Sequence, residues 1–169
     1  MKSYTVRDYV HIALVAALYV VLTITPPLNA ISYGMYQFRV SEMLNFLAFY
    51  NKKYITAVTI GCMIANFYSF GIIDVFVGGA STLIFVSLGV YLFSKYKNEY
   101  LFNGQINKAF FYFSLFFAAS MITVAIELYF VAKLPLLMTW FTTGVGEFAS
   151  LIIGSIIIDK LSKSMDLSL

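Results

Sequence analysis

The chain is poor in the residues that build disulfides, metal sites and charged surfaces. Its 169 residues include one cysteine, Cys62, and one histidine, His11, which excludes a disulfide framework and a Cys/His metal site. It contains no GxxxxGK[ST], HExxH or GxSxG motif, so neither ATP hydrolysis nor metal-dependent chemistry is indicated. We therefore expect no catalytic residues, no cofactor and no metal, and any energy for a reaction or transport step must come from a partner or a gradient.

Charge is also scarce, and apolar residues take its place. Only 11% of the residues are charged, whereas 61% are hydrophobic and 18% aromatic, far from the roughly 25% charged residues of soluble domains. This composition predicts an all-α integral membrane protein. Residues 1–169 have room for a single domain, a compact bundle of six transmembrane helices, and for no soluble domain beside it. The basic residues form short clusters between apolar segments, so the net charge of +3 reflects topology rather than nucleic-acid binding.

Six apolar segments give the expected helices. A proline pair, Pro26-Pro27, ends the first, which is long for a signal peptide and is interpreted as a retained helix. The second is short. The expected ranges are 9–28, 38–50, 54–70, 72–96, 109–132 and 136–161, with a loop at 29–37 and a polar linker at 95–108.

Lysine and arginine fall almost entirely on one side of this six-helix topology. Cytoplasmic loops retain positive charge, so both termini are expected in the cytoplasm and the loops 29–37, 69–73 and 133–139 outside. Only Lys133 and Arg39 fall on the outer side. The cytoplasmic set is Lys2, Arg7, Lys52, Lys53, Lys95, Lys97, Lys108, Lys160 and Lys163.

Polar side chains from five segments converge near the outer side. Ionisable groups in a membrane are expensive and by default indicate a functional site. Arg39 and Glu42 are three residues apart and can pair, which leaves an excess of acid that favours a cation or a ligand rich in N–H donors. Nearby aromatic residues, including Tyr33, Tyr36 and Trp140, could stack on a flat ring. The polar set is Arg39, Glu42, Asn45, Asn66, Asp74, Glu127 and Glu147.

Each of these residues also has a structural interpretation. Arg39 and Glu42 could be only a structural ion pair. Asp74 could merely cap the start of its helix, where acidic residues are favoured. Glu127 and Glu147 could bond a neighbouring helix or be neutral, Asn66 could join helices, and aromatic residues gather at membrane interfaces anyway. Small residues recur every four positions and predict close helix contacts, either internal or with a partner. They are Ala13 and Ala17; Ala57, Gly61 and Ala65; and Gly146, Ser150 and Gly154.

Three stretches resemble one family. The runs YGMYQFRVSEMLNFLAFYNKKYI, GCMIANFYS and IIDVFVGGASTL are similar to the QueT family, the queuosine-precursor substrate-binding S components of energy-coupling factor (ECF) transporters. The resemblance implies a six-helix bundle that captures a vitamin-like solute from outside. It also implies association with a coupling transmembrane subunit and two ABC ATPase subunits, and toppling of the loaded bundle to release its cargo inward.

The ligand that the resemblance implies is a 7-deazaguanine such as preQ1, a flat ring with a cationic aminomethyl group. One of Glu127 and Glu147 would accept N–H bonds from the ring and the other would pair with the ammonium group. The resemblance places the contact with the coupling subunit at Ala13 and Ala17. Alternatives are an S component for another solute, a small intramembrane enzyme, or an assembly protein. The full expected substrate-binding set is Glu127, Glu147, Asn66, Gln37, Arg39, Glu42, Asp74, Tyr36 and Trp140.

Overall fold

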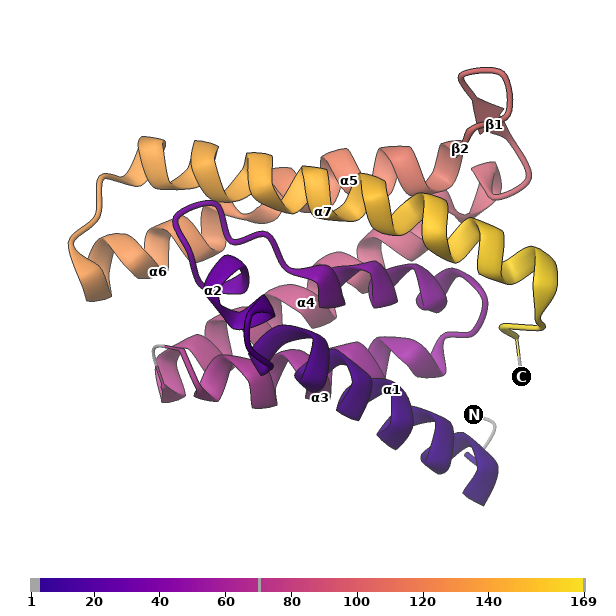
Figure 1. Cartoon of the computed structure of the whole chain (residues 1–169), viewed down its shortest axis with the longest axis horizontal. Helices are drawn as coiled ribbons and strands as arrows, with labels where there is room; N and C mark the ends of the chain where they lie inside the picture. Colours follow the sequence, from indigo (N-terminus) through magenta and orange to yellow (C-terminus); the bar gives the residue numbers. More distant parts are fainter. Residues whose placement is uncertain (1–3, 70, 169) are drawn as a thin grey trace.

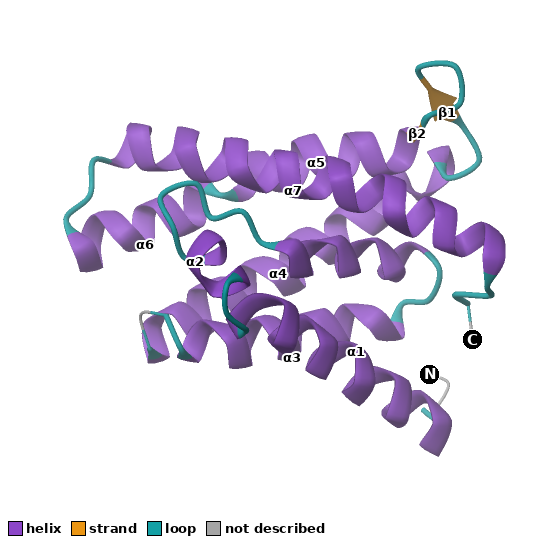
Figure 2. Ribbon diagram, in the orientation of Figure 1, coloured by secondary structure: helices purple, strands orange, loops and turns teal. Residues whose placement is uncertain are grey.

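A computed structural model describes residues 4–69 and 71–168, and this part of the chain is helical apart from one small hairpin (Figures 1 and 2). The hairpin pairs β1 with β2 antiparallel, with Tyr100 opposite Asn107. The elements are α1 (Val6–Ile24), α2 (Leu28–Ser32), η1 (Val40–Phe49), α3 (Lys53–Phe67), α4 (Ile72–Phe93), η2 (Ser94–Tyr96), β1 (Tyr100–Leu101), β2 (Ile106–Asn107), α5 (Lys108–Ser120), α6 (Ile122–Ala132) and α7 (Leu136–Ser164).

Four helical stretches of the described chain are long and apolar enough to cross a membrane: Val6–Ile24, Ile72–Tyr96, Lys108–Ala132 and Leu136–Ser164. Two shorter apolar helices, Val40–Phe49 and Lys53–Phe67, lie among them. The prediction of an all-helical, multi-pass membrane protein is therefore confirmed. The expected end of the third span, Phe70, lies outside the described residues.

Local sequence signals set several helix ends. The side chain of Thr5 accepts a hydrogen bond from the backbone N–H of Asp8, whose carboxylate accepts one from the backbone N–H of Thr5. This reciprocal cap starts α1. Asn107 caps α5 in a similar way, accepting from two backbone N–H groups of its first turn. Lys133, in the left-handed region at φ 58°, ends α6.

Three local features differ from the expected helices. The second segment, η1, is a ten-residue 3-10 helix, although such helices rarely exceed three or four residues. The fifth segment is divided at Met121 into α5 and α6. The polar linker contains the β1–β2 hairpin.

Aromatic packing explains the 3-10 form of η1. A period of three residues places Met43, Phe46 and Phe49 in one column. The Phe46 ring lies 4.4 Å from the Phe110 ring and 5.4 Å from the Phe113 ring, between centroids. Phe46, Phe110 and Phe113 are fully buried. The same period aligns Glu42 with Asn45 in another column, so this short helix has an apolar face and a polar face.

The ends of the bundle are distinct. In Figure 1 the start of α1, the β1–β2 hairpin and the end of α7 lie at one end, and the α6–α7 connection lies at the other. Between these ends α1 packs mainly against α3, α3 against α4, and η1 against α7. The central η1 therefore touches both halves of the chain, which makes its polar face a natural wall for a site.

Candidate functional site

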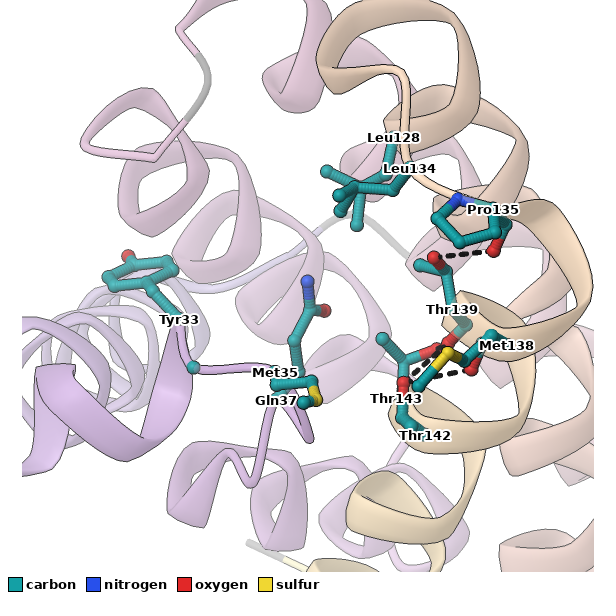
Figure 3. Close-up of a pocket in the computed structure, with 11 residues that line it drawn as sticks. Tyr33, Met35, Gln37, Leu128, Leu134, Pro135, Met138, Thr139, Thr142 and Thr143 are labelled. Carbon is teal, nitrogen blue, oxygen red and sulfur yellow. Dashed lines mark hydrogen bonds between the residues drawn. The ribbon is translucent and has the colours of Figure 1, made fainter.

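A cavity of about 400 Å³ opens between the loop before η1, the end of α6 and the start of α7 (Figure 3). This volume lies in the range of small-molecule sites. The side-chain amide of Gln37 extends into it, opposite the threonines of α7. Gln37 is buried and has a positive φ of 46°. The oxygen of its side-chain amide, Oε1, has no hydrogen-bond partner. The other lining residues are Tyr33, Gly34, Met35, Leu128, Leu134, Pro135, Met138, Thr139, Thr142 and Thr143.

The α7 wall of this cavity presents threonine hydroxyl groups that already donate their protons to backbone carbonyls. Thr139 donates to the carbonyl of Pro135 at 2.8 Å, Thr142 to that of Met138 at 3.0 Å, and Thr143 to that of Thr139 at 2.8 Å. Their oxygens can still accept hydrogen bonds. This wall therefore suits a ligand that donates.

A stripe of small residues on α7 holds the loop and η1 close. A Cβ added to Gly146 would lie 1.7 Å from the carbonyl oxygen of Tyr36, so only glycine fits there. The Ser150 hydroxyl donates to the carbonyl of Arg39, and one turn further along α7 a Cβ on Gly154 would lie 2.3 Å from that of Met43. The small face predicted on this helix is thus internal packing.

Arg39 lies just before η1, buried, and connects three segments. Its Nη1 donates to the Oδ1 of Asn66 at 3.0 Å, and its Nε to the carbonyl of Ser32 at 3.4 Å. Asn66 in turn donates to the backbone carbonyl of Asp74 at 3.2 Å. A Cβ on Gly78 would lie 1.9 Å from the Nδ2 of Asn66, so that glycine makes room for the amide. The guanidinium is therefore fixed by α2 and α3, and Asn66 links it to the start of α4.

Glu42 has both oxygens occupied by neutral donors. The phenol of Tyr19 donates to Oε1 at 2.5 Å, and the amide of Asn45 donates to Oε2 at 2.6 Å. The direct Arg39–Glu42 pair that we predicted does not form, because Arg39 precedes η1 and turns to Asn66. Within residues 4–69 and 71–168 the ion pairs are Asp8–Lys53, Glu99–Lys108 and Asp159–Lys163.

Glu127 and Glu147 are buried, with 5% and 1% of their surface exposed. All four of their carboxylate oxygens lack a hydrogen-bond partner. Asp74 and Arg39 interact electrostatically with Glu127, and Glu42 and Arg39 with Glu147; a neighbouring carboxylate supplies no donor as long as it is ionised. Buried polar groups are normally satisfied. These acids therefore point to a donor-rich ligand.

Comparison with known proteins agrees with this chemistry. Residues 9–163 match the family described as QueT transporter. The "Queuosine precursor transporter QueT" of Lactococcus lactis subsp. cremoris (strain MG1363) is 65% identical over 168 residues, which cover 99% of this chain and 99% of that protein. The chain belongs to the QueT transporter family. No solved structure matches it.

Membership of the QueT family confirms the resemblance based on residues 33–55, 61–69 and 72–83 and places the chain among multi-pass membrane transporters rather than enzymes. The acids do not line the 400 Å³ cavity themselves. Glu147 lies one turn along α7 from Thr143, about 6 Å by helix rise. Glu127 precedes the cavity residue Leu128 and lines a separate groove between α4 and α6.

Two residues of the expected set lie at the surface of this QueT family member. Tyr36 is 55% exposed and Trp140 is 37% exposed, and neither lines the cavity. The indole N–H of Trp140 donates to the carbonyl of Ala119 at 3.0 Å, where α5 gives way to α6. Tyr33 lines the cavity, but in Figure 3 its ring points away from the other lining residues, and its phenol donates to the carbonyl of Ala65 at 2.6 Å.

Several residues of the site were not in the expected set. The threonines of the α7 wall have a readable signal, because Thr139, Thr143 and Glu147 follow at intervals of four and share a helix face. Asn45 is aligned with Glu42 only by the 3-10 period. Tyr19, whose phenol holds Glu42, had no signal, because a tyrosine in an apolar span is ordinary.

Proposed function

We propose that this QueT family member is the substrate-binding S component of an ECF-type transporter and that it captures preQ1 from outside the cell. One contrast supports the proposal: Glu42 has a donor on each oxygen, whereas Glu127 and Glu147 have none. The relative's name specifies a queuosine precursor. PreQ1 combines ring N–H donors with an ammonium group, which are the groups that two unpaired carboxylates would bind.

The ligand would enter by the 400 Å³ cavity. Gln37 and the threonine hydroxyls offer polar contacts. The backbone of Tyr36 covers α7 at Gly146, next to Glu147, so the loop before η1 must move off α7 for a ligand to reach this acid. One acid would take the guanine-like edge and the other the ammonium group; Asn66 and Arg39 would hold the wall behind them.

Burial separates the three small-residue faces and supports docking of the coupling subunit on α1. The face on α7 packs on the loop and η1. On α3, Ala57 and Ala65 are fully buried, and a Cβ on Gly61 would lie 2.7 Å from that of Tyr19. Ala13 and Ala17, in contrast, are exposed. We propose that they contact the coupling transmembrane subunit, which acts with two ABC ATPases.

The proposed topology has six membrane crossings with both termini in the cytoplasm. The two shorter apolar helices, η1 and α3, would complete the four membrane-length stretches. The connections that carry Lys52, Lys95 and Lys97, between η1 and α3 and between α4 and α5, lie at the same end of the bundle as the end of α7 (Figure 1). Positive charge at one end agrees with a cytoplasmic location of that end.

Calorimetry with the purified chain in lipid nanodiscs tests the ligand. PreQ1 should bind without ATP, and Glu147→Gln or Glu127→Gln should weaken binding at least tenfold, since a charge-assisted bond to a buried acid is worth about 1.5–3 kcal/mol. Glu99→Gln, which alters an exposed ion pair of the linker, is the matched control and should bind normally. Absence of preQ1 binding alongside binding of another vitamin would refute the assignment, as would conversion of a solute by the chain alone.

A further inference from the structure

Tyr19 makes the polar link between α1 and Glu42. Its side chain is fully buried, and its phenol lies 2.5 Å from the Oε1 of Glu42. A second link lies one turn further along α1: the hydroxyl of Thr23 bonds that of Ser41 at 2.7 Å and the carbonyl of Tyr19 at 2.8 Å. Helix α1 therefore holds the polar side of η1 through two hydroxyl groups.

The opposite face of α1 is exposed. Tyr19 and Ala17 are two positions apart, which is about 200° around a helix, and Ala13 lies on the Ala17 side. Both alanines are exposed, while Ala16 is buried on the Tyr19 side. A single rigid helix thus has the proposed docking face on one side and the Glu42 contact on the other.

Glu42 is also the neighbour of a ligand-binding candidate. The carboxylates of Glu42 and Glu147 interact electrostatically, and Glu147 has no donor of its own. A ligand donor that binds Glu147 changes the charge that Glu42 faces, and Glu42 is tied to α1 by its shortest hydrogen bond. Ligand binding and the position of α1 are therefore connected through the Tyr19–Glu42 hydrogen bond and the electrostatic interaction between Glu42 and Glu147.

We propose that Tyr19 is a positioning residue that fixes Glu42 on the polar face of η1 and couples substrate binding to docking of the partner on the opposite face of α1. This proposal rests on the proposed function. Coupling of this kind is reciprocal: if substrate changes the affinity for the partner by some factor, the partner changes the affinity for substrate by the same factor.

Tyr19→Phe tests the proposal, because the ring stays and only the hydroxyl is lost. We expect preQ1 binding to the full chain to weaken about tenfold, the effect of leaving one buried charged acceptor short of a donor. The second measurement is the affinity for the purified energy-coupling module, with and without preQ1. In the wild type preQ1 should change this affinity, and in Tyr19→Phe the ratio should fall toward one.

Tyr100→Phe is the matched control, since it removes another phenol that donates to a carboxylate, that of Asp159 at 3.0 Å, at the other end of the bundle. It should leave both measurements unchanged. Thr23→Val, which removes the second hydroxyl link, should shift the ratio in the same direction as Tyr19→Phe and serves as the test if that variant does not fold.

The outcomes separate the two proposals. A wild-type chain that does not bind preQ1 overturns the proposed function, and the role of Tyr19 with it. If the wild type binds preQ1 but Tyr19→Phe binds it equally well, or keeps the wild-type ratio, the positioning role is overturned and the proposed function stands. A loss of thermal stability alone, with both measurements unchanged, would make Tyr19 merely structural.

Discussion

The same substitution, glutamate to glutamine, is predicted to have opposite effects on stability at Glu147 and at Glu42. Glu147 is buried with neither oxygen bonded, so a neutral amide removes an uncompensated acid from the bundle. Glu42 accepts from Tyr19 and Asn45. An amide there would place its NH₂ group against one of these two donors and lose that bond.

The magnitudes follow from the hydrogen-bond partners. A buried group without a partner costs about 1–3 kcal/mol, and more when it is charged, so removing the charge of Glu147 should gain about 1–3 kcal/mol although the amide still lacks partners; losing a bond to a charged acceptor costs about 1.5–3 kcal/mol. For a chain of this length 1 kcal/mol moves the melting temperature by about 2–4 °C. In the absence of ligand, Glu147→Gln should therefore melt about 2–12 °C higher than the wild type, and Glu42→Gln about 3–12 °C lower.

Ligand should narrow this difference for Glu147. At a concentration 100 times its Kd, a ligand stabilises the state that it binds by about 2.7 kcal/mol, which corresponds to about 5–11 °C for the wild type. A Glu147→Gln variant that binds tenfold more weakly would be at only about 10 times its own Kd there, so its melting temperature should rise by about 3–6 °C, about half the wild-type shift. Thermal unfolding followed by tryptophan and tyrosine fluorescence in nanodiscs measures both quantities. A Glu147→Gln variant that is less stable than the wild type, or that keeps the full preQ1 shift, would refute this reasoning.

Two further variants probe the proposed docking face and the close contact between α7 and the loop. Ala13→Leu combined with Ala17→Leu should abolish co-purification with the energy-coupling module while preQ1 affinity stays normal; unchanged co-purification would contradict docking on α1. Gly146→Ala should destabilise the chain by about 1–3 kcal/mol and weaken preQ1 binding, because its Cβ would meet the Tyr36 carbonyl at 1.7 Å. Gly144→Ala, whose nearest contact would be 3.2 Å, is the comparison, and an equal loss of stability in both would show that the close approach is not the cause.

Composition and motif were enough to predict the family, the helical membrane fold and the residues that become unpaired acids. Burial of charge is costly wherever it occurs, so Glu127 and Glu147 stand out in any apolar sequence. The 3-10 form of η1 was also readable in principle, since Met43, Phe46 and Phe49 repeat every three residues. The expected pairing of Arg39 with Glu42 assumed that both lie on one helix, whereas η1 begins at Val40 and Arg39 lies before it.

Other features depend on partners that are distant in sequence. The break at Met121 has no proline or glycine to announce it. Two hydrogen bonds hold it: one joins the hydroxyls of Ser81 and Thr123 at 2.9 Å, and the other runs from the indole N–H of Trp140 to the carbonyl of Ala119. Likewise, spacing alone could not tell which small-residue face stays open, because that depends on which helices pack together.

The 3-10 geometry of η1 also affects how far the chain reaches. Ten residues rise about 20 Å in a 3-10 helix, compared with about 15 Å in an α-helix. In the proposed six-crossing topology, a segment too short to cross as an α-helix would thus come closer to the far interface, where Asn51 and Lys52 follow it. Because η1 already has the longer rise of a 3-10 helix, it cannot lengthen to absorb a deletion. Deleting one residue would rotate the residues beyond it by about a third of a turn and move the column of Glu42 and Asn45 out of register with α1.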